Sequence, residues 1–283
     1  MRHIFAVIGG DMRLTLLASA LSRQGHGTVR LAGETASAAE IAEAVRGADC
    51  AILPLPLSVR EGKLNAPLAS SPAELAEVFA GLRGVPLVCA GRVDEASRAL
   101  AHEAGIEIED YYEREELAVM NAAATAEGAV MLAMQETAGT LCGERVLVTG
   151  FGRIGRLLAL RLRALGAEVT AAARSAADKA WAEAFGCRAA DISALGSIRG
   201  CGVVFNTVPA RVFTERVLAA MEPDTLLIDL ASRPGGVDFE AASRLDRRVV
   251  WALSLPGEAA PEAAGAAIGR AVMNILAERG RGA

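Results

Sequence analysis

Short apolar runs alternate with amphipathic stretches along the N-terminal part of the chain. The runs are rich in Val, Ile, Leu and Ala, and the stretches between them repeat apolar positions at helical spacing. This alternation predicts a parallel, doubly wound sheet. The predicted strands are His3–Ile8, Gly27–Leu31, Cys50–Leu55, Pro86–Ala90 and Ile106–Glu109, and the predicted helices are Met12–Gln24, Ser37–Arg46, Pro72–Leu82 and Asp94–Ala104. The longest loop, Leu57–Ser71, is a candidate mobile lid.

The same alternation returns in the C-terminal part of the chain. A long helix rich in Ala, Met, Leu and Glu is predicted from Glu113 to about Gln135, with no Gly/Pro linker between the halves. We therefore expect a rigid helical connection. The predicted strands of this part are 145–149, 168–173, 202–207, 224–229 and 248–252, and a final helix is predicted from about Pro261 to Arg279.

A glycine signature opens this second half. The β-branched run Val146–Thr149 leads into Gly150-x-Gly152-x-x-Gly155, and an amphipathic helix continues to Leu165. The first glycine makes the tight turn, the second lets the backbone approach a pyrophosphate, and the third lets the helix pack on its strand. The pattern predicts a dinucleotide site. Its predicted contacts are Gly150, Gly152, Arg153, Ile154 and Gly155.

The tip of the next strand indicates the nucleotide. An acidic residue would bind a ribose 2′-hydroxyl there, but this chain has Ala173-Arg174-Ser175. A guanidinium and a hydroxyl can bind a 2′-phosphate, so we predict NADP over NAD, with Arg174 and Ser175 as contacts. The alternative is a solvated Arg174 and an NAD held by its other contacts.

These patterns predict an α/β protein with two Rossmann-like, doubly wound parallel-sheet domains joined by long crossover helices. We expect a substrate domain over residues 1–115, with a connecting helix over 116–138 and a C-terminal helix over 258–280 packed near it. The NADP-binding domain is expected over 140–256. A cleft between two such domains is the expected place for a small ligand.

Composition narrows the functional class. The 283 residues carry a net charge of −5, which argues against nucleic acid as a partner. No uninterrupted apolar run approaches the ~20 residues of a membrane span, and the first residues indicate a strand and turn rather than a signal peptide. We therefore expect a cytoplasmic protein. Five scattered cysteines, and three histidines that all lie at or before His102, give no metal-ligand spacing, so we predict no metal site.

Polar residues at strand tips are the candidate chemistry. After the first strand, Asp11 can cap a helix, and Arg13 lies in a first turn where the helix dipole disfavours a cation. An anionic ligand would explain that cation, although a capped turn with an exposed arginine is an equal alternative. Glu113 and Glu116 open the connecting helix, where acidic residues also suit the dipole. On the same helix Asn121, Thr125 and Gly128 share one face.

Two further tips lie in the second half. Asn206-Thr207-Val208-Pro209 follows one strand, and Thr207 and Pro209 are candidate contacts on the nicotinamide side; an ordinary turn is the alternative. The other is Asp229-Leu-Ala-Ser232-Arg233-Pro-Gly-Gly, where Ser232 is a candidate cofactor contact and Arg233 can clamp a carboxylate bidentately. The alternative here is a loop whose Asp229 satisfies backbone donors.

With these motifs the chain resembles the dipicolinate synthase A-subunit family over nearly its whole length. The shared strings are Ile-Gly-Gly-Asp-x-Arg at 8–13, Glu113-Arg-Glu, Asn121, Thr125-x-Glu127-Gly128, the glycine turn, Ala173-Arg174-Ser175, Asn206-Thr207-x-Pro209, residues 229–236 and Leu255-Pro-Gly-x-x-Ala-Pro261. The resemblance implies an NAD(P)-dependent dehydrogenase of sporulation, located in the mother-cell cytoplasm. It would oxidise dihydrodipicolinate, or its hydroxylated precursor, to dipicolinate, together with a flavoprotein-like second subunit.

The candidate residues suit such a reaction. Arg13 and Arg233, one from each domain, are expected to hold the two carboxylates of the substrate. Asp11, Glu113 and Glu116 are candidate bases that the sequence does not rank. We also expect a homo-oligomer.

Three alternatives stay open. A D-2-hydroxy-acid dehydrogenase shares the two-domain plan but needs a late histidine, and this chain has none after His102. The others are an amino-acid dehydrogenase and a non-catalytic NADP-binding subunit.

Overall fold

The computed structural model describes residues 2–60 and 62–282. The chain divides into two compact units, which are described separately. Unit 1 comprises Met1–Met120 and Pro261–Ala283, and unit 2 comprises Asn121–Ala260. The division falls inside the helix α5 (Glu115–Glu136), so the first residues of this helix belong to unit 1 and the rest to unit 2.

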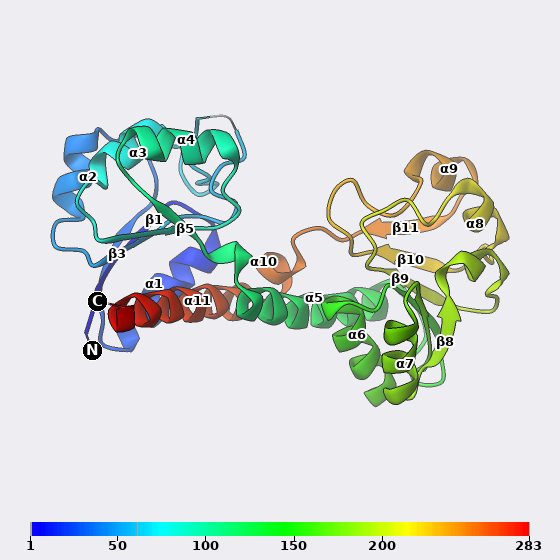
Figure 1. Cartoon of the computed structure of the whole chain (residues 1–283). Coiled ribbons are helices and arrows are strands. Elements are labelled where there is room, and N and C mark those ends of the chain that lie inside the picture. The colour runs from blue at the N-terminus through cyan, green and yellow to red at the C-terminus, as the bar shows by residue number, and fades with distance from the viewer. Residues whose placement is uncertain (1, 61, 283) are drawn as a thin grey trace. The chain divides into compact units, whose positions relative to one another are not determined.

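Unit 1 contains a five-stranded parallel sheet in the order β2-β1-β3-β4-β5. Its strands are β1 (Ile4–Ile8), β2 (Gly27–Leu31), β3 (Cys50–Ile52), β4 (Leu87–Ala90) and β5 (Ile108–Asp110). One face packs against α1 (Met12–Arg23) and α11 (Pro261–Gly282), and the other against α2 (Ala38–Ala44), α3 (Leu75–Gly81) and α4 (Glu95–Glu103) (Figure 1). A short 3₁₀ helix, η1 (Tyr111–Glu113), leads into α5.

Two elements of unit 1 are shorter than the sequence pattern predicts. The apolar run Cys50–Leu55 forms a strand only to Ile52, because Pro54 and Pro56 have no N–H group to give to a neighbouring strand. Helix α3 begins at Leu75 rather than Pro72, because Pro72 and Ala73 instead bond across to the segment at Gly33 and Glu34.

The loop at residues 57–71 is anchored in the unit. Leu57, Leu64 and Ala66 are buried in the core, and the Asn65 carbonyl accepts the N–H group of Gly10 at 2.8 Å. The Asn65 side-chain amide also donates to the Pro56 carbonyl. These contacts hold the described part of the loop, which excludes Glu61, against the first strand tip. A lid role for the loop stays a prediction.

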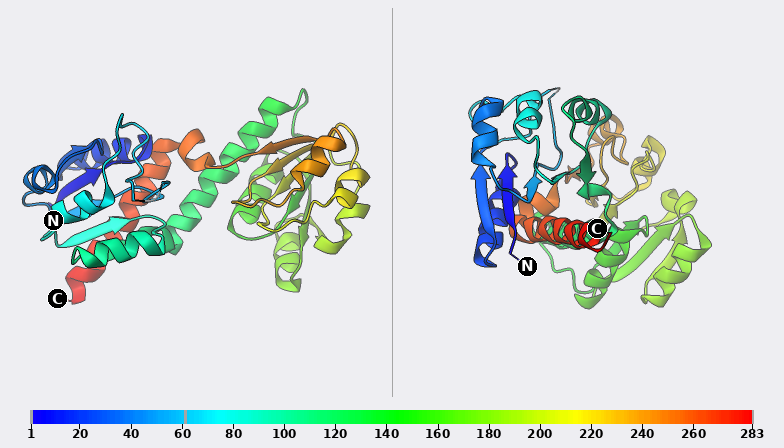
Figure 2. Two further views of the ribbon diagram at one scale, coloured as in Figure 1. Left: turned by 90° about the horizontal axis from the view of Figure 1, so that it is seen from above. Right: turned by 60° about the vertical axis from the view of Figure 1, so that its left-hand side comes forward.

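Unit 2 contains a six-stranded parallel sheet in the order β11-β10-β9-β6-β7-β8, and Figure 2 shows it and the unit 1 sheet from two further directions. Its strands are β6 (Arg145–Thr149), β7 (Glu168–Ala173), β8 (Arg188–Asp191), β9 (Val203–Asn206), β10 (Leu226–Asp229) and β11 (Arg248–Trp251). The edge strand β8 was not predicted, because Arg188-Ala-Ala-Asp191 contains no β-branched residue.

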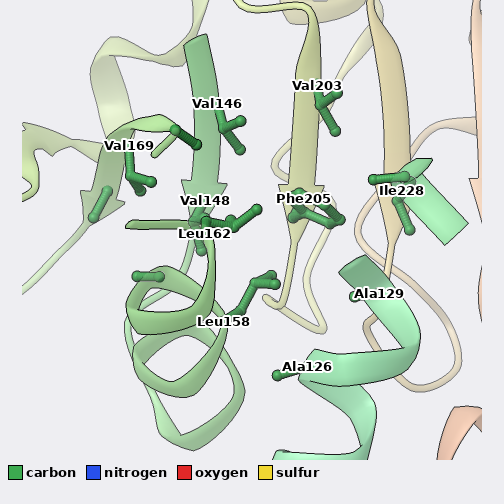
Figure 3. Close-up of a cluster of buried hydrophobic side chains, with 14 of the residues drawn as sticks. Ala126, Ala129, Val146, Val148, Leu158, Leu162, Val169, Val203, Phe205 and Ile228 are labelled. Atoms are coloured by element: carbon green, nitrogen blue, oxygen red, sulfur yellow. The ribbon is translucent and has the colours of Figure 1, made fainter. Parts of the chain in front are cut away.

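Helices cover both faces of this sheet. One face packs against α5, α6 (Arg153–Ala164) and α7 (Ala176–Ala184), and the other against η2 (Ile192–Ser197), α8 (Glu215–Ala220) and α9 (Phe239–Arg244). Figure 3 shows the first of these cores, where Leu158 and Leu162 of α6 and Ala126 and Ala129 of α5 lie against strand residues such as Phe205. The structure confirms two α/β units with all-parallel sheets.

Helix α5 has the composition of a membrane span. It is the one helix of the described residues that is long and apolar enough to cross a membrane, by length and composition alone. However, Ala126, Ala129 and Ala133 are fully buried in the core of unit 2, and Gly128 lies against α10 (Leu255–Ala259). A core helix that packs closely against a sheet has this same composition.

Candidate nucleotide-binding site

The three glycines after β6 have distinct surroundings. Gly150 has a φ of +89°, and a Cβ atom there would overlap Thr207 Oγ1. A Cβ atom on Gly155 would overlap the Gly150 carbonyl oxygen, so close packing requires both glycines. By contrast, a Cβ atom on Gly152 would meet nothing within 4 Å. The turn therefore keeps open space beside Gly152, where the motif places a pyrophosphate.

The N-terminus of α6 suits an anion. Gly152 is its N-cap and has no side chain to bond the N–H groups of the first turn, and no acidic residue occurs in that turn. Such N–H groups have no acceptor within the helix and carry partial positive charge. Gly152, Arg153, Ile154 and Gly155, all predicted cofactor contacts, belong to this turn. The residues present fit the pyrophosphate of a dinucleotide.

Thr207 binds Thr149, the residue that directly precedes the glycine turn. Its Oγ1 donates to the Thr149 carbonyl at 3.0 Å, and its N–H group donates to the same oxygen at 2.8 Å. The hydroxyl proton is thus used inside the protein, although Thr207 and the exposed Pro209 lie at the predicted strand tip. Their contact with a cofactor stays a prediction.

The two candidate residues at the tip of β7, Arg174 and Ser175, have different surroundings. Arg174 is exposed and makes no hydrogen bond or ion pair with a described residue. Ser175 instead caps α7: its Oγ accepts the Asp178 N–H group at 3.0 Å and donates to Asp178 Oδ2 at 2.7 Å. Arg174 is therefore the group at this tip that is free to bind an anion.

Sequence reasoning missed Arg156 and Asp178. Arg156 donates through Nε to the Phe151 carbonyl in the glycine turn, and through Nη2 to Asp178 Oδ1, both at 2.9 Å. The hydrogen bond from Ser175, together with the Arg156 charge, lowers the pKa of Asp178 in spite of its partial burial. The chain Phe151–Arg156–Asp178–Ser175 thus links the turn to the β7 tip. Only the spacing Ser175-x-x-Asp178, typical of a helix cap, signals part of it.

A buried polar row crosses the carboxyl end of the sheet. Thr149, Asn206 and Asp229 are in register on β6, β9 and β10, and all three are fully buried. Asn206 Nδ2 donates to Asp229 Oδ1 at 2.8 Å and to the Val208 carbonyl at 3.0 Å, while Asn206 Oδ1 accepts the Val208 N–H group. The row lies directly beneath the loops that carry Pro209 and Arg233.

Asp229 satisfies backbone donors, as one of the sequence alternatives held. It accepts the N–H group of Ala231 at 3.1 Å and that of Gly236 at 2.8 Å. Between these two anchors, Ser232 and Arg233 are exposed. The Arg233 guanidinium lies 5.5 Å from the Trp251 ring centroid and makes no hydrogen bond or ion pair with a described residue. Arg233 therefore presents free donors at the strand tip.

The first strand tip, in unit 1, is different. Both Asp11 oxygens bind the Arg13 guanidinium, and Arg13 Nη2 also donates to the Leu55 carbonyl at 2.6 Å. Arg13 is thus not the freely exposed arginine of the capped-turn alternative, since its side chain is only 18% exposed. Burial raises the pKa of Asp11, but the hydrogen bonds and charge of Arg13 outweigh it and hold that pKa below its ordinary value. Asp11 is therefore a poor base.

The two candidate bases near the start of α5, Glu113 and Glu116, also differ. Arg114 Nε and Asn274 Nδ2 donate to Glu116 Oε1, and these hydrogen bonds lower the pKa of Glu116. Glu113 is exposed, and no hydrogen bond or ion pair joins it to a described residue. Among the three candidates, Glu113 alone keeps a carboxylate that the protein does not already use.

Two of the three residues of the polar stripe on α5, Thr125 and Gly128, have partners within the protein. Thr125 Oγ1 donates to the Asn121 carbonyl at 2.8 Å, and Glu127 pairs with Arg161 at 2.7 Å. A Cβ atom on Gly128 would lie 3.1 Å from Ala259 Cβ, so this glycine allows α10 to approach. The Asn121 side-chain amide makes no hydrogen bond with a described residue, so the packing accounts for Thr125, Glu127 and Gly128 but not for Asn121. Across residues 2–60 and 62–282, no three His, Cys, Asp or Glu side chains gather as a metal site.

Comparisons with known proteins divide the chain in the same way. Residues 4–112 match the N-terminal domain of the dipicolinate synthase A subunit. Residues 115–244 match the NAD binding domain of D-isomer specific 2-hydroxyacid dehydrogenases. Unit 2 is thus an NAD-binding domain, and the chain is an oxidoreductase that uses a nicotinamide cofactor.

Relatives match both units together. The A subunit of dipicolinate synthase from Bacillus subtilis (strain 168) is 33% identical over 234 residues, which cover 81% of this chain and 78% of that protein. The crystal structure of the same subunit from Bacillus halodurans is 28% identical, with a TM-score of 0.84, and covers 97% of this chain and 98% of that one. The corresponding Bacillus subtilis structure is 29% identical, also with a TM-score of 0.84, and covers 98% and 97%.

More distant structures share the fold alone. A D-lactate dehydrogenase from Sporolactobacillus is 16% identical with a TM-score of 0.69, covering 100% of this chain and 97% of that one. Because the Bacillus relatives match both units, this chain belongs to the dipicolinate synthase A-subunit family.

Proposed function

We propose that the chain is an NADP-dependent dehydrogenase that oxidises dihydrodipicolinate, or its hydroxylated precursor, to pyridine-2,6-dicarboxylate during sporulation. Binding of a nicotinamide coenzyme is supported by the open space beside Gly152, at the start of α6, where no side chain caps the helix. The substrate part rests on the family and on the free guanidinium of Arg233 at the tip of β10, which lies two strands from β6 in the same sheet. A dicarboxylate substrate requires such cations.

The choice of NADP rests on Arg174. Its guanidinium is exposed and makes no hydrogen bond or ion pair with a described residue. It stands at the tip of β7, where an NAD-binding domain would carry an acidic residue. A carboxylate there would repel a 2′-phosphate, whereas a guanidinium binds one through charge-assisted hydrogen bonds. Ser175 contributes mainly as the cap of α7.

The bound nicotinamide supplies the hydride acceptor. Dihydrodipicolinate would lose one ring hydride and one proton and become aromatic, and the hydroxylated precursor would lose one molecule of water in addition. Because aromatisation favours the reaction, correct orientation matters more than a strongly tuned base. Arg233 would bind one carboxylate and so fix the ring, while Glu113 is the best remaining acceptor for the proton. That Arg13 and Arg233 hold opposite ends of one substrate stays a prediction.

The test is an assay of the purified chain with NADP and freshly prepared dihydrodipicolinate, followed by the rise in reduced-nicotinamide absorbance. Turnover in the single chain supports the proposal. Turnover that appears only with a flavoprotein-like second subunit supports a catalytic role within an assembly, and we propose such a partner because the relatives are named as subunits. No turnover in either case, despite tight NADP binding, would favour a non-catalytic NADP-binding subunit.

The remaining proposals follow the family. We propose a cytoplasmic site of action in the mother cell and a homo-oligomeric state, to be measured by light scattering. A D-2-hydroxy-acid dehydrogenase is less suitable, because unit 2 contains no histidine to exchange a hydroxyl proton.

A further inference from the structure

Asp229 fixes both ends of the loop that carries Arg233. Its Oδ1 accepts the Ala231 N–H group on one side of the exposed residues, and its Oδ2 accepts the Gly236 N–H group on the other side. Asn206 Nδ2 adds a third donor. All these acceptors lie on a fully buried carboxylate, so the loop closes over an anchor that water does not reach.

Two glycines allow the loop to wrap this closely. Gly235 has a φ of +86°, and a Cβ atom there would lie 3.0 Å from Asp229 Oδ2. A Cβ atom on Gly236 would overlap the Asn206 amide and lie 2.6 Å from the Val208 carbonyl oxygen. Larger side chains at either position would push the backbone away from the carboxylate.

Trp251 contacts both the backbone of this loop and the side chain of Arg233. Trp251 Nε1 donates to the Ala231 carbonyl at 3.0 Å, and the Trp251 ring lies under the Arg233 guanidinium. Trp251 in turn stacks on Phe239 at 4.8 Å between ring centroids. The backbone of the loop and the side chain of Arg233 are thus both positioned, while the guanidinium keeps its hydrogen-bond donors for a ligand.

We propose that Asp229, together with Asn206, is a positioning residue for Arg233. The buried pair holds the loop so that Arg233 meets a substrate carboxylate, and the same pair fixes the loop at Val208 and Pro209. This inference rests on the proposed function, because it assigns the carboxylate ligand to Arg233. Asp229 itself touches neither substrate nor coenzyme.

The chemistry explains why Asn is not equivalent to Asp at position 229. Both oxygens of Asp229 accept from N–H groups, and only a carboxylate offers acceptors on both sides. In Asp229→Asn, the new amide N–H group must oppose either the Gly236 N–H group or the Asn206 amide. The loop would lose one of the hydrogen bonds that anchor it, while the volume of the side chain at position 229 stays the same.

The experiment measures pyridine-2,6-dicarboxylate binding to the NADPH-loaded chain by calorimetry, with NADPH affinity measured separately. Asp229→Asn should weaken dicarboxylate binding by about tenfold or more, which corresponds to about 1.4 kcal/mol. NADPH affinity should fall by a clearly smaller factor than dicarboxylate affinity, because the glycine turn and Arg174 lie on other loops and only the predicted contacts Thr207, Pro209 and Ser232 lie on the loops that this pair holds. Asp224→Asn is the matched control, since Asp224 is exposed in the same unit and has no partner among the described residues.

A double-mutant cycle tests whether Asp229 acts through Arg233. Arg233→Met should weaken dicarboxylate binding, and adding Asp229→Asn should then cause little further loss. Equal, additive losses in the two backgrounds would overturn the inference. If Asp229→Asn fails to fold, Asn206→Ala takes its place, with a smaller loss expected because two of the three donors to Asp229 remain.

Trp251 provides a readout that needs no substrate. The chain has two tryptophans, so Trp181→Phe leaves Trp251 as the sole emitter. Asp229→Asn should shift its emission to longer wavelength, because a loosened loop admits water to the ring. If the parent chain binds no dicarboxylate, the proposed substrate is wrong, while this shift still tests the anchor. Unchanged emission in Asp229→Asn would show that Asp229 does not hold the loop.

Discussion

The Asp11 carboxylate binds the Arg13 guanidinium through both of its oxygens, with Arg13 Nη2 2.7 Å from Asp11 Oδ2. The two residues are separated by a single position, and the pair forms at the start of α1. Arg13 Nη2 also binds the Leu55 carbonyl, so the pair ties the end of β1 to the segment after β3. A residue pair that resembled a simple helix cap is thus a cross-link within unit 1.

This pair predicts a pH-dependent contribution to stability. The pKa of Asp11 is lowered on folding, so its contribution is full above the unfolded pKa of about 4 and is lost as the pH falls through the lower folded value. Asp11→Asn should lower the free energy of unfolding by about 1 kcal/mol at pH 7, a modest figure because the carboxylate is partly exposed. Urea unfolding at pH 7 and pH 3 measures the gap. A gap of the same size at both values would contradict the prediction.

The glycine turn predicts opposite outcomes for two similar substitutions. Gly155→Ala should destabilise unit 2 by about 1–3 kcal/mol, because the new methyl group overlaps the Gly150 carbonyl oxygen. Gly152→Val should leave the melting temperature nearly unchanged but weaken NADP binding severely, because its side chain fills the open space beside the turn. Thermal melting and calorimetry separate the two effects. A Gly152→Val chain that binds NADP normally would place the coenzyme elsewhere.

Arg174 predicts coenzyme selectivity. Arg174→Met should weaken NADP binding by about 10- to 100-fold, the range expected for a lost hydrogen bond to a charged group. NAD binding should change less than about threefold, since NAD lacks the 2′-phosphate. Arg216→Met, an exposed arginine without a partner among the described residues, is the control. If Arg174→Met weakened the binding of NADP and of NAD equally, Arg174 would act through its general charge and not through the 2′-phosphate.

The two glutamates Glu113 and Glu116, at the start of α5, predict a division between activity and stability. Glu113→Gln should lower kcat with little change in melting temperature, because Glu113 bonds to no described residue. Glu116→Gln should lower the melting temperature with little change in kcat, because it weakens the contacts to Arg114 and Asn274. Loss of activity confined to Glu116→Gln would reverse the assignment of the base.

The sequence predicted what depends on local pattern. The glycine turn, the strands around it and the division into two α/β halves all follow from short-range spacing, and the structure confirms this fold class. Register across a sheet cannot be predicted in this way. The row formed by Thr149, Asn206 and Asp229 requires the neighbour order β6-β9-β10, in which strands distant in sequence lie side by side.

Side-chain pairing was equally hidden. Arg13 and Ser175 were expected to face ligands, but each has a protein partner within three positions in sequence. Such short-range partners compete with any ligand, and periodicity gives no indication of which will prevail. Arg233 and Arg174 remained free because no carboxylate of a described residue is placed near enough to bind them.

Helix α11 has a consequence for how the protein is made. Its Ala267, Ile268 and Ala271 are buried beside α1 in unit 1, and Gly269 allows the close approach of Leu17. On the ribosome, however, this helix is synthesised after every residue of unit 2. The nascent N-terminal sheet must therefore wait with the face beside α1 only partly covered, so the nucleotide-binding unit is the first to reach its finished form, and any chaperone that attends translation should be needed for the earlier segment.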